Sequence, residues 1–168
     1  MRDKIIKDHG ELARRVRELK KQGKRIVFTS GGFNFLHVGH VRIICDAKRL
    51  GDILVVGLNS DSSIKKFKGP DYPIMPQDER LEMIAALACP DFVTLFSEKR
   101  ADALLRRLKP HVHAKGGDYT LETVPERDTV RAYGGEIAIV GGPKDHASSG
   151  MIDLVRKWDI RRGCKKAA

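Results

Sequence analysis

Two histidines three residues apart, His37 and His40, are the side chains of this chain best suited to phosphate chemistry. They end the segment 29–40, TSGGFNFLHVGH, which follows a short apolar run and opens a stretch of helical character at 41–50. A helix start presents unpaired N–H groups and the positive end of the helix dipole. Two glycines let the backbone approach a ligand closely, and imidazoles on one face of the first turn can reach the same phosphate. The segment predicts a phosphate-binding corner suited to nucleotides.

Two other interpretations of the histidines are open. They can be a helix cap and a packed imidazole, or they can be two ligands of a metal ion, which their spacing allows. Cys45 is near in sequence, but it lies five residues after His40 and faces another side of the helix. We therefore predict a phosphate site and no protein-bound metal. Its nucleotide-binding residues are Gly31, Gly32, Phe33, His37, Gly39 and His40.

Three further segments carry groups that suit a nucleotide site. KGPDYP at 68–73 is expected to be a loop after the second strand, and KGGDY at 115–119 follows the fourth. Asp118 can accept hydrogen bonds from ribose hydroxyls or an amino group, and Tyr119 can stack or pack. A pair of serines opens the last expected helix, where hydroxyls and N–H groups can bind phosphates. These segments add Lys115, Gly116, Asp118, Tyr119, Ser148 and Ser149 to the predicted nucleotide site.

Strand and helix patterns alternate along the chain. Short apolar runs, most of them rich in β-branched or aromatic residues, are separated by segments with helical spacing. The runs occupy residues 26–28, 53–58, 92–96, 112–114 and 137–140. This alternation predicts an α/β, Rossmann-like parallel sheet of about five strands with helices on both faces. Because ligands bind at the carboxyl ends of such strands, the polar segments are expected to meet at one edge of the sheet.

We expect a single domain at 25–158, preceded by a helical extension at 1–24 and followed by a basic tail at 159–168. Asn59 and Asp61 come just after the second strand and are predicted to line the cleft, with helix capping as an equal alternative. His111 and His113 alternate on a strand and are expected to be structural.

Taken together, these segments resemble the nucleotidylyltransferase superfamily, which has an H-x-G-H corner, and above all its heptose 1-phosphate adenylyltransferases. The likeness extends over residues 5–158. It implies Mg²⁺-dependent transfer of AMP from ATP to a sugar 1-phosphate, D-glycero-β-D-manno-heptose 1-phosphate, with release of pyrophosphate. The acceptor phosphate can attack the α-phosphorus directly, so the protein supplies alignment and positive charge.

The resemblance also implies roles for individual residues. His37, His40 and Lys68 would be catalytic, with Lys68 in a mobile loop that meets the phosphates of both substrates. Arg80 resembles the arginine of the family's E-R-x-x-x-L stretch and would contact the nucleotide, although it can equally be a surface charge near a helix start. The acceptor would be bound by Asn34, Asn59, Asp61 and Lys68.

Some positions depart from the heptose enzymes. Gly32 stands where they usually have cysteine, and Asn34 where they usually have aspartate. Residues 146–149 read HASS in place of R-S-T-T, so the arginine is missing. Because of these departures, the resemblance does not decide which nucleotide base or which phosphorylated acceptor the protein uses. The alternative within the class is a cytidylyltransferase acting on an alcohol phosphate or phosphonate.

The formal net charge of +10 raises an alternative of another class, a basic nucleic-acid-binding domain. Much of the excess lies at the two chain ends, and an apolar stripe of Leu12, Val16 and Leu19 leaves the N-terminal charges on the outer face of a helix. Aromatic residues, which stack on bases, make up only 6% of the chain. We therefore expect ATP and a sugar 1-phosphate as partners, and no nucleic acid.

The remaining expectations concern the cellular location, the cysteines and the oligomeric state of the protein. No apolar run approaches the about 20 residues of a membrane span, and the N-terminus lacks an apolar signal core, so we expect a cytoplasmic protein without a membrane partner. The cysteines Cys45, Cys89 and Cys164 show no paired spacing and are expected to remain reduced thiols. We expect a homodimer, because related enzymes often pair through the sheet edge near the active site.

Overall fold

The protein alternates helices and strands as predicted. The structure, a computed structural model, describes residues 2–142, 150, 154–155 and 157. The elements are η1 (Arg2–Lys4), α1 (His9–Lys21), β1 (Ile26–Gly31), α2 (Val38–Lys48), β2 (Ile53–Asn59), α3 (Asp61–Lys68), α4 (Gln77–Ala86), β3 (Phe92–Phe96), α5 (Asp102–Leu108), β4 (Val112–Gly116), α6 (Arg127–Ala132) and β5 (Glu136–Val140). Each predicted apolar run is a strand. No helix in the described ranges has both the length and the apolar character needed to cross a membrane.

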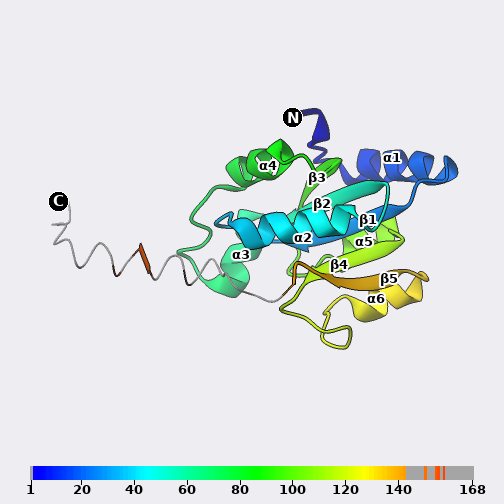
Figure 1. The fold of residues 1–168 in the computed structure, drawn as a ribbon. Coiled ribbons are helices and arrows are strands. Elements are labelled where there is room, and N and C mark those ends of the chain that lie inside the picture. Colours follow the sequence, from blue (N-terminus) through cyan, green and yellow to red (C-terminus); the bar gives the residue numbers. More distant parts are fainter. Residues whose placement is uncertain (1, 143–149, 151–153, 156, 158–168) are drawn as a thin grey trace.

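The five strands form one parallel sheet in the order β3-β2-β1-β4-β5 (Figure 1). The chain proceeds outward from β1 through β2 to β3, then returns to the other side of β1 with β4 and β5. Strand order therefore reverses between β1 and β4, and the carboxyl ends of these two neighbours flank the crevice where open α/β sheets bind ligands. The predicted α/β, Rossmann-like fold is confirmed.

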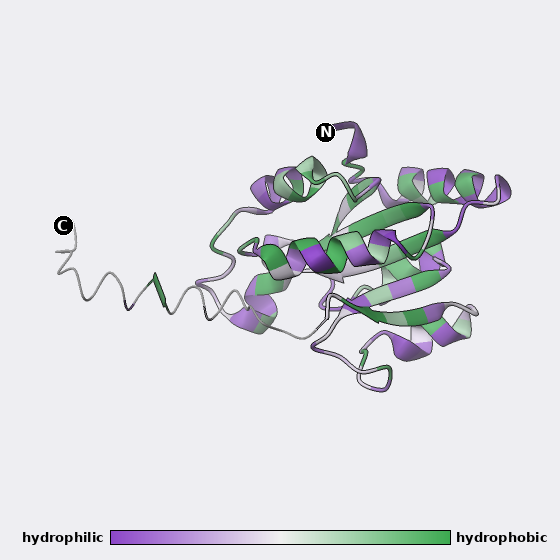
Figure 2. Cartoon of the chain, viewed as in Figure 1, coloured by the Kyte–Doolittle hydropathy of each residue, from purple (hydrophilic) through white to green (hydrophobic). Residues whose placement is uncertain are grey.

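Helices cover both faces of the sheet. The side chains of β1 alternate, so that Ile26 and Phe28 pack with α1, α5 and α6, whereas Val27 packs with α2 and α4. Figure 2 shows the resulting pattern, with largely hydrophobic strands between helices that alternate hydrophobic and hydrophilic residues. Leu12 and Val16 of α1 are fully buried in this core. The N-terminal helix is thus packed against the sheet domain.

Two of the cysteines are paired. Cys45 in α2 and Cys89, which follows α4, form a disulfide with their Cα atoms 5.4 Å apart. The expectation that both remain reduced thiols was wrong. The two cysteines are 44 residues apart in sequence, but α2 and α4 lie on the same face of the sheet. Cys164 is outside the described residues.

Candidate active site

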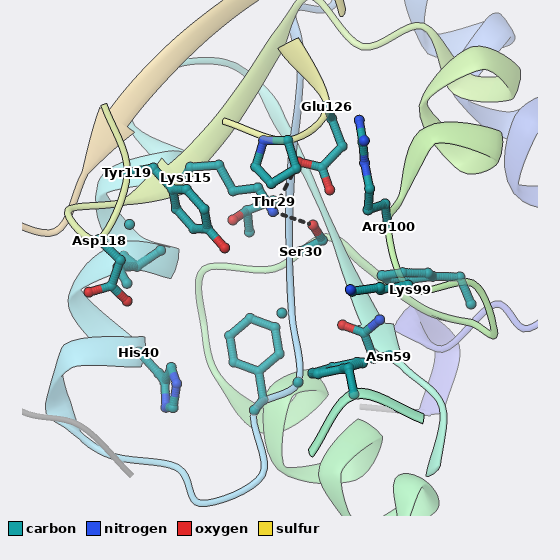
Figure 3. A pocket seen from close by; sticks show the side chains of 18 of the residues that line it. Thr29, Ser30, His40, Asn59, Lys99, Arg100, Lys115, Asp118, Tyr119 and Glu126 are labelled. Carbon is teal, nitrogen blue, oxygen red and sulfur yellow. Dashed lines mark hydrogen bonds and ion pairs between the residues drawn. The ribbon is translucent and has the colours of Figure 1, made fainter. Parts of the chain in front are cut away.

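A cavity of about 570 Å³ lies at the carboxyl ends of β1 and β4. It is on the sheet edge at which strand order reverses, as the α/β fold predicts. Ten of the predicted site residues line it, namely Gly31, Gly32, Phe33, His40, Asn59, Lys68, Lys115, Gly116, Asp118 and Tyr119. Figure 3 shows His40, Asp118 and Tyr119 on one side of this pocket, Lys99, Arg100 and Asn59 on the opposite side, and Lys115 with Ser30 between them.

The H-x-G-H corner forms the start of α2. His37 is the residue that precedes the helix, in an extended conformation, and its side chain makes no capping hydrogen bond. Its ring stacks on that of His40, with ring centroids 3.9 Å apart, and Phe33 meets His40 edge-on at 5.2 Å. Gly39 lies in the first turn between the two histidines. Both imidazoles therefore stand together at the positive end of α2, as predicted.

His40 is a neutral imidazole at neutral pH. Burial lowers its pKa, and the neighbouring His37 and Lys68 lower it further, to about 4, while Asp118 acts in the opposite direction. Its Nδ1 atom is buried and has no hydrogen-bond partner among the described residues. A buried ring nitrogen without a partner is costly unless a ligand satisfies it. The corner is thus suited to an anionic ligand.

The segment KGGDY begins within β4, because Lys115 and Gly116 are its last two residues. A Cβ atom on Gly116 would lie 2.7 Å from Cδ1 of Ile43 in α2, and one on Gly117 would lie 2.4 Å from the carbonyl oxygen of Gly142. Side chains at these positions would separate β4 from α2 and from the chain after β5. The two glycines therefore allow the close packing that forms this wall of the pocket.

Comparison with known proteins agrees with this geometry. The sequence profile of the family described as cytidylyltransferase-like matches residues 28–152. The chain belongs to the cytidylyltransferase-like family. This confirms the predicted nucleotidylyltransferase superfamily, and it makes the pocket at β1 and β4 the candidate active site of a cytidylyltransferase-like domain.

Individual relatives also match this cytidylyltransferase-like chain over most of its length. It is 44% identical over 153 residues to the bifunctional protein HldE of Pelobacter propionicus, which covers 91% of this chain and 31% of that protein. HldE of Geobacter sulfurreducens is 43% identical over 155 residues, covering 92% of this chain and 32% of that protein. The chain spans about a third of the length of these relatives.

Two solved structures share the fold. A lipopolysaccharide core biosynthesis protein from Thermoplasma volcanium has a TM-score of 0.60 and 28% identity, and the match covers 70% of this chain and 94% of that one. A pantoate-beta-alanine ligase from Francisella tularensis has a TM-score of 0.60 at 18% identity, with 98% and 81% of the two chains covered. At that identity the ligase supports the fold alone.

Lys68 lines the pocket of this cytidylyltransferase-like domain from the end of a helix. It is the last residue of α3, so the expectation of a loop position was wrong. Its ammonium group lies 5.8 Å from the centre of the Tyr72 ring. Ser60 begins the helix by accepting a hydrogen bond from the backbone N–H of Ser63, and Gly69 ends it. The irregular segment predicted from Lys68 onward thus begins one residue later.

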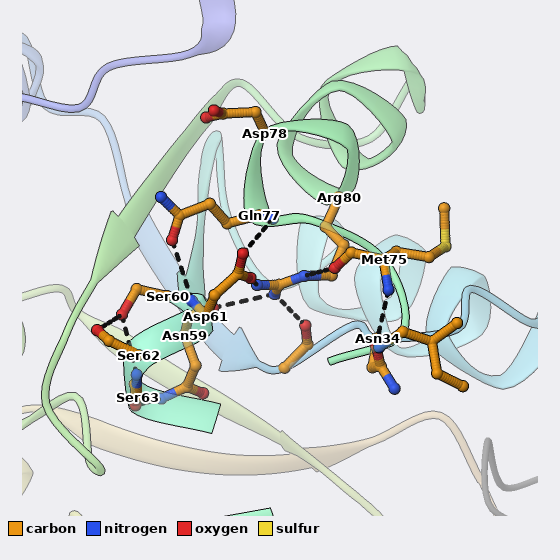
Figure 4. A network of polar contacts seen from close by, with 12 residues as sticks. Asn34, Asn59, Ser60, Asp61, Ser62, Ser63, Met75, Gln77, Asp78 and Arg80 are labelled. Atoms are coloured by element: carbon orange, nitrogen blue, oxygen red, sulfur yellow. Dashed lines mark hydrogen bonds and ion pairs between the residues drawn. The ribbon is translucent and has the colours of Figure 1, made fainter. Parts of the chain in front are cut away.

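Arg80 does not line the pocket; its side chain is buried in the polar network shown in Figure 4. Nε donates to the carbonyl oxygen of Met75 at 3.0 Å, and Nη1 donates to those of Gly32 and Asn59 at 2.5 and 2.9 Å. Nη2 donates to Oδ1 of Asp61 at 2.6 Å. The guanidinium therefore ties the start of α4 to the chain after β1 and the end of β2.

The polar residues predicted to bind the acceptor belong mainly to the same network. Oδ1 of Asn34 accepts hydrogen bonds from the backbone N–H groups of Ile74 and Met75, at 2.6 and 3.3 Å. Asn34 is buried and, like Asp61, does not line the cavity. Asn59 lines it, while its amide donates to Ser63 Oγ at 3.0 Å. Ser148 and Ser149 lie outside the described residues.

Nine residues of the pocket wall were not among the predicted site residues. They are Thr29, Ser30, Ile43, Phe67, Phe96, Lys99, Arg100, Pro125 and Glu126. Lys99 and Arg100 follow β3, so the rule that ligands bind at carboxyl strand ends would have found them. Glu126 precedes α6 and has no such signal in the sequence. Among the described residues, no group of three or more histidine, cysteine, aspartate or glutamate side chains could hold a metal ion.

Proposed function

We propose that this chain transfers AMP from ATP to a sugar 1-phosphate, most specifically D-glycero-β-D-manno-heptose 1-phosphate, and releases pyrophosphate. The observation that carries this proposal is the stacked pair His37 and His40 at the start of α2, where His40 lies on the wall of the cavity at the carboxyl ends of β1 and β4. Nucleotidyl transfer needs no protein nucleophile, because an acceptor phosphate oxygen can attack the α-phosphorus directly. The protein has to align two anions and offset their charge.

The nucleotide would occupy the side of the pocket that holds His40, Asp118 and Tyr119 (Figure 3). Its triphosphate would meet the N–H groups and the dipole at the start of α2. The neutral imidazole of His40 can donate one hydrogen bond to a phosphate oxygen, and charge that develops in the transition state strengthens that bond. Asp118 is available for ribose hydroxyls or an amino group.

The acceptor phosphate would lie beside the lysines that line the cavity. Lys68 ends α3, Lys99 follows β3 and Lys115 is the penultimate residue of β4, so three separate parts of the chain bring basic side chains to one cavity. Two substrates that both carry phosphate repel each other, and cations fixed between them lower that repulsion without reorganising during the reaction. This arrangement favours a phosphorylated acceptor over a neutral alcohol.

We propose Mg²⁺ as the cofactor. When bound, it neutralises polyphosphate charge, and it is usually held by one or two carboxylates together with substrate phosphates. The pocket wall fits this mode of binding, since Asp118 presents carboxylate oxygens beside His40. Chelation with EDTA is expected to abolish turnover, and added Mg²⁺ to restore it.

Relatives support the choice of a sugar acceptor. The solved protein from Thermoplasma volcanium is named for lipopolysaccharide core biosynthesis. The chain also aligns with about a third of the bifunctional protein HldE. Together with the cytidylyltransferase-like family match, these likenesses favour a nucleotide donor and an acceptor used in lipopolysaccharide biosynthesis.

The deciding experiment is a matrix of nucleoside triphosphates against phosphorylated acceptors with Mg²⁺, read by pyrophosphate release. ATP with D-glycero-β-D-manno-heptose 1-phosphate is expected to have the highest kcat/KM. If CTP or GTP exceeds ATP about tenfold, a preference of about 1.4 kcal/mol, the base assignment is wrong. If no pair releases pyrophosphate, the reaction class is wrong.

The homodimer and the cytoplasmic location predicted from the sequence remain proposals. Light scattering of the purified chain tests the first, with an expected mass twice that of the 18.8 kDa monomer. Cell fractionation tests the second.

A further inference from the structure

A buried cluster of three titratable side chains lies at the pocket wall, and two of its members line the cavity. Glu126, the residue that precedes α6, is 3% exposed, and its Oε2 atom lies 3.4 Å from Nζ of Lys115 and 3.5 Å from Nε2 of His113. His113 is fully buried and Lys115 is 8% exposed. Oε1 of Glu126 accepts a hydrogen bond from the backbone N–H of Ala101 at 3.4 Å. The carboxylate is thus anchored on one oxygen and faces two basic groups with the other.

The other end of this cluster opens into the cavity. Lys115 and Glu126 both line it, and Nζ of Lys115 donates a hydrogen bond to Ser30 Oγ at 3.2 Å (Figure 3). The ring of Tyr119 lies 5.4 Å from the same nitrogen. Lys115 therefore links the buried carboxylate to the space in which the phosphates are proposed to react.

Packing alone gives little reason for this cluster. Removing two charges from water costs several kcal/mol for each ion, and apolar side chains of similar volume usually stabilise a core as well or better. A lysine at this depth without a carboxylate would tend to lose its proton. The ion pair is therefore best understood through what it does for the pocket.

Among the charged groups that the structure describes around Lys115, Glu126 is the one in direct contact with it. Burial lowers the pKa of Lys115, Glu126 raises it, and the more distant Arg100 and Asp102 act in opposite directions. Arg100 is itself paired with Asp102 at 2.8 Å. Burial also lowers the pKa of His113, which leaves this ring neutral at neutral pH.

Glu126 in turn stays ionised. Burial raises its pKa, but the contacts with His113 and Lys115 outweigh that effect and hold the pKa at about 2. At neutral pH the cluster therefore contains a carboxylate and a neutral imidazole, and the carboxylate favours the charged form of the Lys115 amine.

We propose that Glu126 is a positioning residue that keeps Lys115 charged and directed into the pocket, where the ammonium ion binds the phosphate of the acceptor. This inference rests on the proposed function for the identity of the anion. The link between Glu126 and the protonation of Lys115 does not depend on it, so the two can be tested separately.

The first test measures the protonation of Lys115 without using activity. The protein is labelled with trace acetic anhydride between pH 6 and 10, and the peptide that contains Lys115 is quantified by mass spectrometry, since only the neutral amine reacts. Glu126→Gln keeps the size of the side chain and an acceptor for Ala101 but removes the charge. Its Lys115 is expected to titrate at least about one pH unit lower, so that the whole labelling curve shifts to lower pH by that amount.

The matched control is Glu122→Gln, an acid-to-amide change at an exposed position of the same segment. Its labelling profile should coincide with that of the unsubstituted protein. If Glu126→Gln also leaves the profile of Lys115 unchanged, the proposal is refuted, whatever the protein catalyses.

The second test connects the charge to the reaction. In Glu126→Gln, kcat/KM for the acceptor is expected to fall at a lower pH than in the unsubstituted protein. Arginine does not lose its proton in this range, so adding Lys115→Arg should remove that fall. A purely structural role of Glu126 would lower activity equally at every pH, and that outcome would overturn the positioning role.

Two safeguards keep the outcomes distinct. If Glu126→Gln does not fold, as judged by circular dichroism, the single variant Lys115→Arg decides. The unsubstituted protein is expected to lose kcat/KM at high pH, and Lys115→Arg should lack that decline. An unchanged decline in Lys115→Arg refutes the proposal. If no acceptor and triphosphate pair reacts with the unsubstituted protein, the proposed function fails, and the labelling profiles alone confirm or refute the effect of Glu126 on Lys115.

Discussion

The imidazole rings of His37 and His40 stack at a centroid distance of 3.9 Å with an interplanar angle of 28°, at the first turn of α2. Two imidazoles so close cannot both be cationic without strong repulsion. Both rings stand at the positive end of α2, where their N–H groups can donate to one anionic ligand.

Removing either ring should damage the reaction more than the fold. His37→Ala and His40→Ala are each expected to lower kcat about 10²–10³-fold, because each removes a preorganised donor to the transition state. The side chain of His37 makes no capping bond, so α2 should still form. Pyrophosphate release and circular dichroism are the measurements, with His9→Ala, whose ring contacts the Leu95 carbonyl oxygen, as the control away from the pocket. Near-normal turnover of a folded variant would exclude that histidine from the mechanism.

Acid should destabilise the protein partly through His40. Its pKa is about 4 in the folded state, below its ordinary 6.5, mainly because burial disfavours the charged form. The unfolded chain therefore binds the proton first, and the stability that the neutral ring supplies is complete above pH 6.5 and is lost as the pH falls toward 4. This contribution is at most about 3 kcal/mol.

Urea unfolding of the unsubstituted protein and of His40→Asn between pH 7.5 and 4 tests that linkage. The variant should lose less unfolding free energy on acidification, while the difference between the two proteins should stay constant above pH 6.5. Parallel losses across the whole range would show that His40 does not titrate as described.

Two lysines of α3 should behave differently. Lys68 lines the pocket, whereas Lys66 is exposed two residues earlier, roughly half a helical turn away. Lys68→Ala is expected to lower kcat and raise KM for both substrates, with a loss in kcat/KM of about tenfold or more. Lys66→Ala should have little effect in the same steady-state assay. Equal effects, or a larger effect at Lys66, would refute the role of Lys68.

Arg80 should prove essential for stability. Its side chain is fully buried and makes four hydrogen bonds, including the ion pair with Asp61. A lysine cannot reproduce this planar set, so Arg80→Lys is expected to lower the free energy of unfolding by about 3–5 kcal/mol in urea. Arg107→Lys on the exposed face of α5 should change it little. Unchanged stability with a raised KM for ATP would instead support the nucleotide contact predicted from the sequence.

Asn34 offers a test of the loop that precedes α4. Asn34→Asp retains an oxygen for the N–H groups of Ile74 and Met75 and strengthens both bonds, so folding should persist and kcat/KM should stay the same or rise. Asn34→Leu leaves two N–H groups without that acceptor and should cost about 1–3 kcal/mol in unfolding free energy. A loss of activity in Asn34→Asp without loss of stability would contradict this interpretation.

Much of the fold and one part of the site could be predicted from the sequence. Short apolar runs predict strands such as β2 and β3, and their alternation with helical segments predicts a parallel sheet. Both signals are available because the spacing of apolar residues is a local property of the chain. The corner at residues 37–40 could be predicted for the same reason, since helix starts and glycine turns depend on neighbours in sequence.

The sequence by itself therefore determined the alternating α/β elements and the presence of a phosphate-binding corner. Only the tertiary structure decided which distant groups meet there. The sheet joins β1 to β4 and so brings Ser30 within 3.2 Å of Lys115, 85 residues later. It also buries Arg80 as an internal ion pair and pairs Cys45 with Cys89. These outcomes depend on strand order and on which helices share a face, and no local spacing encodes such long-range contacts.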